Sequence, residues 1–270
     1  MSAQTTFSSR QFNPFARVLY FVVALWVLTM ISLPIVRWVF GDDALPIGIT
    51  LGVLIQLTAV MTSLVYGWGV ARSAVVIAIV LTLGWAVEYI GHRTGFPFGS
   101  YVYTDLLQPQ IGGVPILIPL AWMMMMPPAW AVAYAITHRL TGIRRAIAYV
   151  GIAMLAFTAW DLFLDPQMVA WGLWVWDDPG ATSYFGIPWS NYAGWLLAAG
   201  VMTLATLPFQ QPERLPLRPL LIIYGLTWAL QTIGLLVFWG MPGPALVGFA
   251  GMGVFLGLAV RAVRAQRAAS

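Results

Sequence analysis

Eight runs of apolar residues, separated by short stretches that are polar or rich in Gly and Pro, make up most of the chain. A helix of roughly 20 apolar residues crosses the ~30 Å hydrocarbon core of a bilayer. The pattern predicts an all-α fold, a polytopic membrane helical bundle with about eight transmembrane helices. It forms one integral membrane domain over residues 1–270, with 1–15 as a polar tail. The predicted spans cover about residues 16–40, 46–69, 73–92, 115–138, 146–165, 190–209, 219–239 and 243–262.

Composition supports a membrane protein and excludes several kinds of chemistry. Hydrophobic residues make up 60% of the chain and charged residues only 8%, against about 25% charged residues in a soluble domain. There is no cysteine, which excludes disulfides, thiol catalysis and Cys-ligated metals. All 13 basic residues are arginines, and the net charge of the chain is +4. We interpret it as the flanking charge of a membrane protein and predict no nucleic-acid partner.

The distribution of charge predicts the orientation. Eleven of the 13 arginines fall on one side of the predicted spans, and only Arg37 and Arg93 fall on the other. The positive-inside rule therefore places both termini in the cytoplasm of a cell whose inner (plasma) membrane holds the protein. Eight of the nine acidic residues lie on the outer side or in the outer half of a span. We take that outer side as the working face.

An internal repeat organises the centre of the chain. Residues 86–122 align without a gap with residues 159–195, at an offset of 73 residues and with seven identities. Each unit is an outward helix, an outer loop rich in Gly, Pro and aromatic residues, and a returning helix. Because both units have the same orientation, we expect a pseudo-two-fold axis along the membrane normal between spans three and four and spans five and six.

Candidate catalytic residues are the ionisable side chains of the two repeat units. Glu88 aligns with Asp161, and His92, one helical turn further, aligns with Asp165. Each helix thus carries two ionisable groups at i and i+4 on one face, and we expect all four around one cavity. Ionisable residues within a membrane are by default candidates for function.

The predicted chemistry is acid catalysis. A desolvated carboxyl keeps its proton near neutral pH, which suits it to protonate an isoprenoid alkene. Aromatic faces would stabilise the resulting tertiary cation, and water from the outer face would capture it as a tertiary alcohol. We expect Glu88, or Glu88 and Asp161 sharing a proton, to be the donor. The expected substrate-binding residues are Phe98, Tyr101, Tyr103, Trp122, Trp174, Trp176, Tyr184 and Asn191.

Three motifs carry a resemblance to a known family. They are E-Y-x-G-x-x-T-G-x-P-F-G-x-Y-x-Y at 88–103, D-L-x-x-D-P at 161–166 and Y-F-G-I-P-x-x-N-Y at 184–192. Over roughly residues 80–200 the chain resembles the CruF-type bacterial carotenoid hydratases. The resemblance implies a membrane enzyme that adds water to the acyclic end of carotenes such as gamma-carotene or lycopene, without a cofactor. It implies functional positions at Glu88, Asp161 and Asp165, and as partners the bilayer, a carotenoid and other carotenoid-pathway enzymes.

Other interpretations stay open at this point. Each carboxyl has a structural alternative, such as an interhelical hydrogen bond, and Asp165 precedes Pro166 at a predicted helix end where it would form a turn. The aromatic residues also fit an interfacial belt. A proton-coupled transporter suits paired carboxyls and repeats, but the acidic residues lie towards one face. An isoprenoid or lipid transferase would need basic residues for diphosphate, and only Arg93 lies near. We predict no metal site, because motifs such as H-E-x-x-H are absent.

Overall fold

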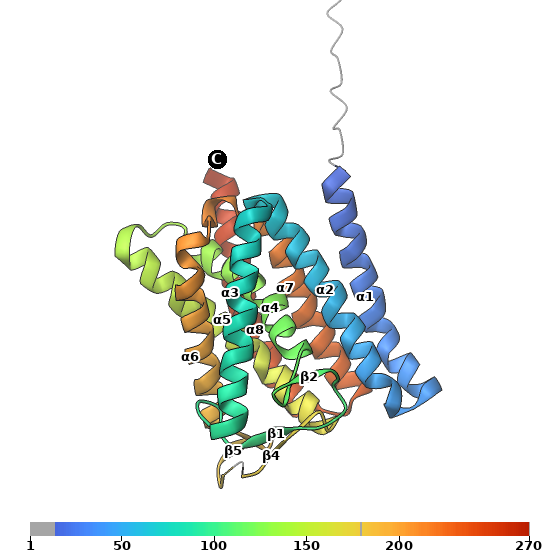
Figure 1. Cartoon of the computed structure of the whole chain (residues 1–270). Helices are drawn as coiled ribbons and strands as arrows, with labels where there is room; N and C mark the ends of the chain where they lie inside the picture. The colour runs from blue at the N-terminus through green and yellow to red at the C-terminus, as the bar shows by residue number, and fades with distance from the viewer. Residues whose placement is uncertain (1–13, 179, 270) are drawn as a thin grey trace, which may run out of the picture.

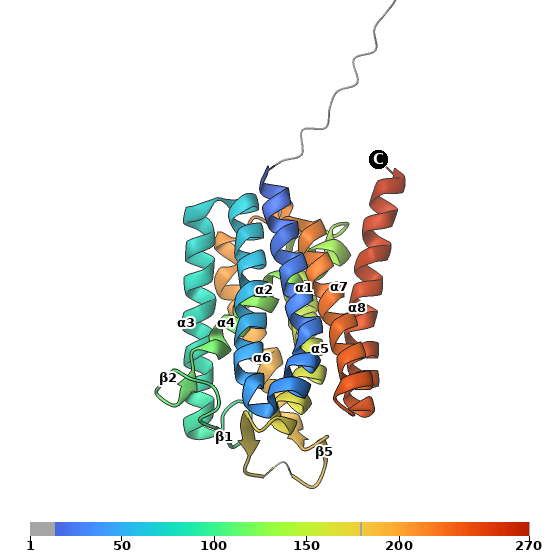
Figure 2. The ribbon, with the colours of Figure 1, turned by 90° about the vertical axis from the view of Figure 1, so that its right-hand side faces the viewer.

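The computed structural model describes residues 14–178 and 180–269, so most of the predicted tail over residues 1–15, with Arg10, lies outside the described residues. Eight of the described helices are long and apolar enough to cross a membrane, as the sequence predicted. They run roughly parallel, with both described ends of the chain at one end of the bundle and the short strands at the other (Figures 1 and 2). The long helices are α1 (Pro14–Phe40), α2 (Leu45–Trp68), α3 (Val70–Thr94), α4 (Leu117–Thr137), α5 (Gly142–Ala170), α6 (Trp189–Thr206), α7 (Leu217–Ile233) and α8 (Pro242–Ala269).

Short elements complete the chain. Three are 3-10 helices: η1 (Asp42–Ala44), η2 (Leu207–Phe209) and η3 (Pro212–Arg214); η4 (Gly234–Phe238) is a π-helical extension of α7. The two long outer loops contain six short strands that the hydrophobic pattern did not predict. They are β1 (Tyr101–Tyr103), β2 (Gln110–Ile111), β3 (Val114–Pro115), β4 (Trp174–Trp176), β5 (Ser183–Tyr184) and β6 (Ile187–Pro188).

Strand pairing shows the pseudo-two-fold axis directly. β1 and β4 pair antiparallel with Val102 opposite Val175, and these two residues are 73 positions apart. An antiparallel pair with equivalent residues opposite each other is what a two-fold axis between two copies of one strand produces. The hairpin of β2 and β3 likewise recurs as the hairpin of β5 and β6, again offset by 73 residues.

Side chains on the same axis continue the relation into the membrane. The rings of Trp122 on α4 and Trp195 on α6 stack with centroids 4.8 Å apart. Deeper, Trp130 Nε1 donates to Thr203 Oγ1 at 3.1 Å. Both pairs are repeat equivalents. The repeat predicted from the sequence is therefore a structural repeat in which α3 and α4 correspond to α5 and α6.

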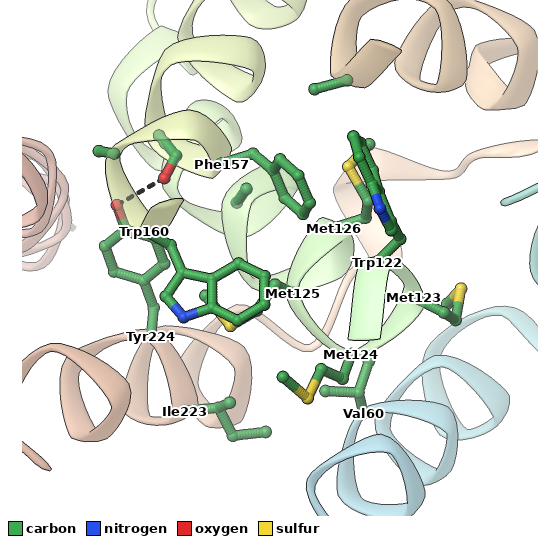
Figure 3. Close-up of a cluster of buried hydrophobic side chains, with 14 of the residues drawn as sticks. Val60, Trp122, Met123, Met124, Met125, Met126, Phe157, Trp160, Ile223 and Tyr224 are labelled. Carbon is green, nitrogen blue, oxygen red and sulfur yellow. Dashed lines mark hydrogen bonds between the residues drawn. The ribbon is translucent and has the colours of Figure 1, made fainter. Parts of the chain in front are cut away.

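Helix α4 is the centre of the bundle. Every residue from Trp122 to Ala133 is buried, and its methionines pack against Phe157 and Trp160 of α5 and against α7 (Figure 3). Figure 3 shows Met123–Met126 spread around α4 within the core, which follows from four consecutive side chains pointing in four directions on a helix.

Helix α5 corrects one expectation. The sequence predicted that the helix ends near Asp165, before Pro166, whereas α5 continues through Pro166 to Ala170. Proline lacks an N–H group, so it leaves the carbonyl four residues earlier, that of Leu162, without its helical partner. The Tyr184 hydroxyl donates to the Leu162 carbonyl at 2.9 Å. A loop side chain thus satisfies the backbone group that proline frees, and Asp165 lies inside a helix rather than in a turn.

Candidate active site

A cavity lies beneath the β1–β4 ribbon, between the four repeat helices. Its wall combines two carboxyls, one amide and many aromatic rings within an apolar surround. The lining residues are Glu88, Phe98, Tyr101, Tyr103, Ile118, Ala121, Trp122, Trp160, Leu164, Asp165, Trp174, Trp176, Asn191 and Trp195.

Glu88 of α3 is the carboxyl of the first repeat and accepts three hydrogen bonds. Tyr101 and Tyr103 of β1 donate their hydroxyls to Oε2 at 2.6 Å and 2.7 Å, and Trp122 donates Nε1 to Oε1 at 3.0 Å. Side chains alternate between the two faces of a strand, so residues i and i+2 point to the same face. Tyr101 and Tyr103 have this spacing on β1, and both therefore reach Glu88. Burial of this carboxyl disfavours a negative charge, and the three donors act against that effect.

The two tyrosines stay protonated. Burial raises the pKa of Tyr101 above its ordinary value, and the nearby Glu88 carboxyl raises it further. Burial and Glu88 raise the pKa of Tyr103 in the same way. Both hydroxyls therefore remain donors throughout the physiological pH range, and they hold the Glu88 carboxylate in one orientation.

The second repeat supplies two carboxyls that share one donor. Asn191 Nδ2 of α6 donates to Asp161 Oδ2 at 2.9 Å and also contacts Asp165 Oδ2, while Trp174 Nε1 of β4 donates to Asp165 Oδ1 at 2.9 Å. Asp161 Oδ1 is buried and has no hydrogen-bond partner among the described residues. Two fully buried carboxyls in contact with the same amide group favour sharing a proton, because two negative charges there would repel.

Aromatic rings form much of the remaining wall. Trp122, Phe157 and Trp195 are mutually stacked, with centroids 4.8–5.3 Å apart, and Trp160 meets Trp195 edge to face at 5.9 Å. Indole faces attract cations most strongly of the side-chain rings, and the attraction grows when water is excluded. The cavity thus offers a cation several π faces near its carboxyls.

The structure brings most predicted site residues together. Of the twelve, nine line the cavity: Glu88, Asp165, Phe98, Tyr101, Tyr103, Trp122, Trp174, Trp176 and Asn191. Asp161 lies behind the wall, next to Asn191. The expected direct pairing of Glu88 with Asp161 is therefore replaced by a pairing of Asp161 with Asp165 through Asn191.

Two predicted residues lie elsewhere. His92 is one turn beyond Glu88, where its ring packs near Tyr101 and Tyr103, at 6.4 Å and 6.2 Å between centroids, and against Gly113. The tyrosines separate it from the cavity. Tyr184 is held at the Leu162 carbonyl, and its position gives it a structural contact rather than a place in the lining.

A match to a known protein family covers the part of the chain that forms this cavity. The sequence profile described as "Carotenoid biosynthesis protein" matches residues 48–263, which is most of the chain and includes both repeats. The chain belongs to this carotenoid biosynthesis family. As a family member it is also 37% identical, over 139 residues, to the bisanhydrobacterioruberin hydratase of Haloarcula japonica. That alignment covers 50% of this chain and 45% of the relative, so less than half of the relative is compared. No solved structure matches the chain significantly.

In this carotenoid biosynthesis protein, sequence reasoning missed five lining residues: Ile118, Ala121, Trp160, Leu164 and Trp195. For Trp195 a signal was present, because it is the repeat equivalent of Trp122. Trp160 directly precedes Asp161, but residue type alone does not tell which face of a buried helix a tryptophan covers. Among residues 14–178 and 180–269, no group of three or more His, Asp or Glu side chains is placed to hold a metal ion.

Proposed function

We propose that this protein hydrates the terminal double bond of an acyclic carotenoid end group, such as that of lycopene or gamma-carotene, and so acts as a hydro-lyase. One observation carries the proposal: two carboxyl sites with different hydrogen bonding face one aromatic cavity inside the membrane. The family and the name of the Haloarcula japonica relative support the substrate class and the reaction type.

Asp165 is the proton donor in this proposal. It lines the cavity, and in this proposal it shares a proton with Asp161, whose carboxyl contacts the same Asn191 amide. Transfer of that proton to the less substituted carbon of the terminal alkene leaves a tertiary carbocation, and the Asp161–Asp165 pair becomes doubly ionised. A buried pair with two charges is a strong base, so it regains a proton readily at the end of the cycle.

Water capture completes the reaction. The rings of Trp122, Trp160 and Trp195 stabilise the cation, and the Glu88 carboxylate orients a water molecule towards the tertiary carbon. As the carbon–oxygen bond forms, the water loses one proton to Glu88, and the product is a tertiary alcohol. A proton returned from Glu88 to Asp165 restores the starting state, so the net reaction adds one water and consumes nothing else.

This assignment reverses part of the hypothesis drawn from the sequence, which gave the donor role to Glu88. Three donors around Glu88, from Tyr101, Tyr103 and Trp122, would stabilise a negative charge on it as it accepts and releases a proton, and this supports the role of a base. Asp165 accepts hydrogen bonds from neutral groups too, but it has a second carboxyl beside it. A carboxyl with an acidic neighbour is the better reservoir for a proton.

The setting in the cell is part of the proposal. The arginine asymmetry supports a cytoplasmic position for both termini, and the structure has the described chain ends on one side and the β1–β4 ribbon on the other (Figure 1). We infer an enzyme of the plasma membrane whose site lies near the outer face and takes its carotenoid from the bilayer. Other enzymes of the carotenoid pathway are its expected neighbours.

Expression in a bacterium that accumulates lycopene tests the function. We expect a more polar pigment, heavier by one water, on liquid chromatography with mass detection. Unchanged pigment in cells that contain the folded protein in the membrane would contradict the proposal for this substrate. The same strain making gamma-carotene then tests the second acyclic end group.

A further inference from the structure

A second cavity lies next to the acid cavity, across Trp160 and Leu164 of α5. It is bounded by α1, α2, α4, α5 and α7. Most of its wall is apolar. It shares two lining residues, Trp160 and Leu164, with the acid cavity, so a single layer of side chains separates the two spaces.

Two indole N–H groups on the wall of this cavity have no acceptor. Trp26 of α1 is 2% exposed and Trp160 of α5 is 1% exposed, and the Nε1 atom of each is buried without a hydrogen-bond partner among the described residues. Figure 3 shows the Trp160 nitrogen turned away from Trp122 and towards Ile223 and Tyr224 of α7. Its N–H group therefore points away from Trp122, which lines the acid cavity.

Such donors are costly to leave unpaired. A buried polar group without a partner loses roughly 1–3 kcal/mol relative to a paired one. The buried indoles of Trp122, Trp130 and Trp174 donate to oxygen, whereas that of Trp176, on the acid cavity, is also unpaired among the described residues. Two unpaired donors on one cavity thus indicate an acceptor that the chain itself does not supply.

The remaining polar groups on the wall are uncharged. Gln56, Gln167, Thr227 and Gln231 line the cavity, and Gln56 Nε2 donates to the thioether sulfur of Met125 at 3.2 Å, a weak acceptor. The described lining contains no charged side chain. The wall thus fits a long apolar molecule with a neutral oxygen, and offers no partner charge for a phosphate or carboxylate.

We propose that this second cavity binds an acyclic isoprenoid chain that bears a hydroxyl group, with Trp26 and Trp160 donating to the hydroxyl oxygen. A purely hydrocarbon carotene has no acceptor for these donors, so the cavity selects for an oxygenated chain. The choice of a carotenoid as the chain rests on the proposed function. The hydroxyl has two possible sources: the tertiary alcohol formed in the acid cavity, or a substrate that arrives already hydroxylated.

Competitive binding tests the site. The full-length protein, purified in detergent, is loaded with an equal mixture of lycopene and 1-hydroxylycopene, and the pigments retained after gel filtration are quantified. We expect preferential retention of the alcohol, and Trp26→Phe, which removes one N–H and keeps an aromatic ring, to reduce the preference about three- to tenfold. The matched control is Trp38→Phe on the same helix, since Trp38 is exposed and lines neither cavity.

Two results would overturn the proposal. One is equal retention of both pigments by the wild type; the other is a preference that survives in Trp26→Phe. If Trp26→Phe fails to elute as a folded protein, Trp160→Phe replaces it in the binding assay, with the same expectation. A cavity that holds only water gives the first result.

Hydration assays separate this inference from the proposed function and identify the source of the hydroxyl. Selective binding without hydration of either pigment would support the second-cavity site and refute the hydratase. Hydration without selective binding would support the hydratase and refute the second-cavity site. If the occupant is the enzyme's own product, added 1-hydroxylycopene inhibits lycopene hydration, and Trp26→Phe relieves the inhibition. If it is an oxygenated substrate, the wild type hydrates 1-hydroxylycopene faster than lycopene, and Trp26→Phe removes the difference.

Discussion

The two repeats build the same scaffold and use it for different carboxyl environments. In the first, Tyr101 donates to Glu88. In the second, Trp174 is the equivalent of Tyr101, but it donates to Asp165, one helical turn beyond the equivalent of Glu88. The backbone follows the two-fold axis where Val102 pairs with Val175. The neighbouring side chains do not follow it, because equivalent positions carry different residues with different partners.

The difference has a chemical consequence. A symmetric pair of carboxyls with identical partners would have identical proton affinities, and neither would be a better acid than the other. Substituting Trp for Tyr and Asp for His at equivalent positions gives one carboxyl with three donors and a second site with two carboxyls. A duplicated scaffold thus yields an acid and a base that face one cavity.

The largest expected effect is that of Asp165→Asn, which removes the proposed proton donor. Because general acid catalysis contributes about 100- to 10,000-fold, we expect turnover of lycopene to fall by a factor in that range. Asp161→Asn leaves Asp165 in the cavity and should cost less. The control is Asp105→Asn, because Asp105 is an exposed carboxyl in the outer loop of the first repeat unit. Equal loss in Asp161→Asn and Asp165→Asn would assign the donor role to the pair rather than to Asp165.

Glu88→Gln is expected to come next. The amide keeps the shape of the side chain but cannot accept the proton released by water, so we expect a loss of about 100-fold or more. Chromatography of pigments from whole cells is the measurement, with the amount of membrane protein determined by immunoblotting. Wild-type turnover in this variant would refute a base at Glu88.

Single donors on each side of the comparison should have smaller effects. Tyr101→Phe removes one of three donors to Glu88, and Trp174→Phe removes the indole donor to Asp165. A hydrogen bond to a charged group is worth roughly 1.5–3 kcal/mol, so we expect Tyr101→Phe to reduce turnover about tenfold or more. Trp174→Phe acts on the protonated pair and should cost less. The reverse order would mean that the acid and base roles are exchanged.

The smallest effect concerns stability at one equivalent pair of glycines. Gly113 and Gly186 both have positive φ, 88° and 85°, so alanine is strained at either position by about 1–2 kcal/mol. A Cβ at Gly113 would also lie 2.6 Å from His92 Nε2, whereas a Cβ at Gly186 meets nothing within 4 Å. We expect Gly113→Ala to lower the melting temperature in detergent more than Gly186→Ala. Equal shifts would show that His92 moves aside freely.

Hydropathy and the repeat predict a large part of this architecture. Long apolar runs give the eight helices because length and composition alone decide whether a segment can span a bilayer. The 73-residue offset gives the two-fold axis, and the axis brings Glu88 and the second-repeat acids to one place. Nine of the twelve predicted site residues line the cavity for this reason.

What the sequence could not supply depends on which way individual side chains turn. Pro166 looked like a helix end, but the helix continues because Tyr184, distant from it in the sequence, donates to the freed carbonyl of Leu162. Asp161 and Asp165 lie on one helix face and both contact Asn191, yet only Asp165 lines the cavity. Tertiary contacts determine these side-chain orientations, and the periodicity of the sequence does not predict them.

The most direct test of the account is the origin of the oxygen atom in the product. Membranes containing the wild-type protein would be given lycopene in isotopically labelled water, and the pigments analysed by mass spectrometry. The account predicts a tertiary alcohol that carries the label from water and is lost in Asp165→Asn. An alcohol whose oxygen comes from dioxygen, or unchanged lycopene with the folded protein present, would contradict acid-catalysed hydration in this cavity.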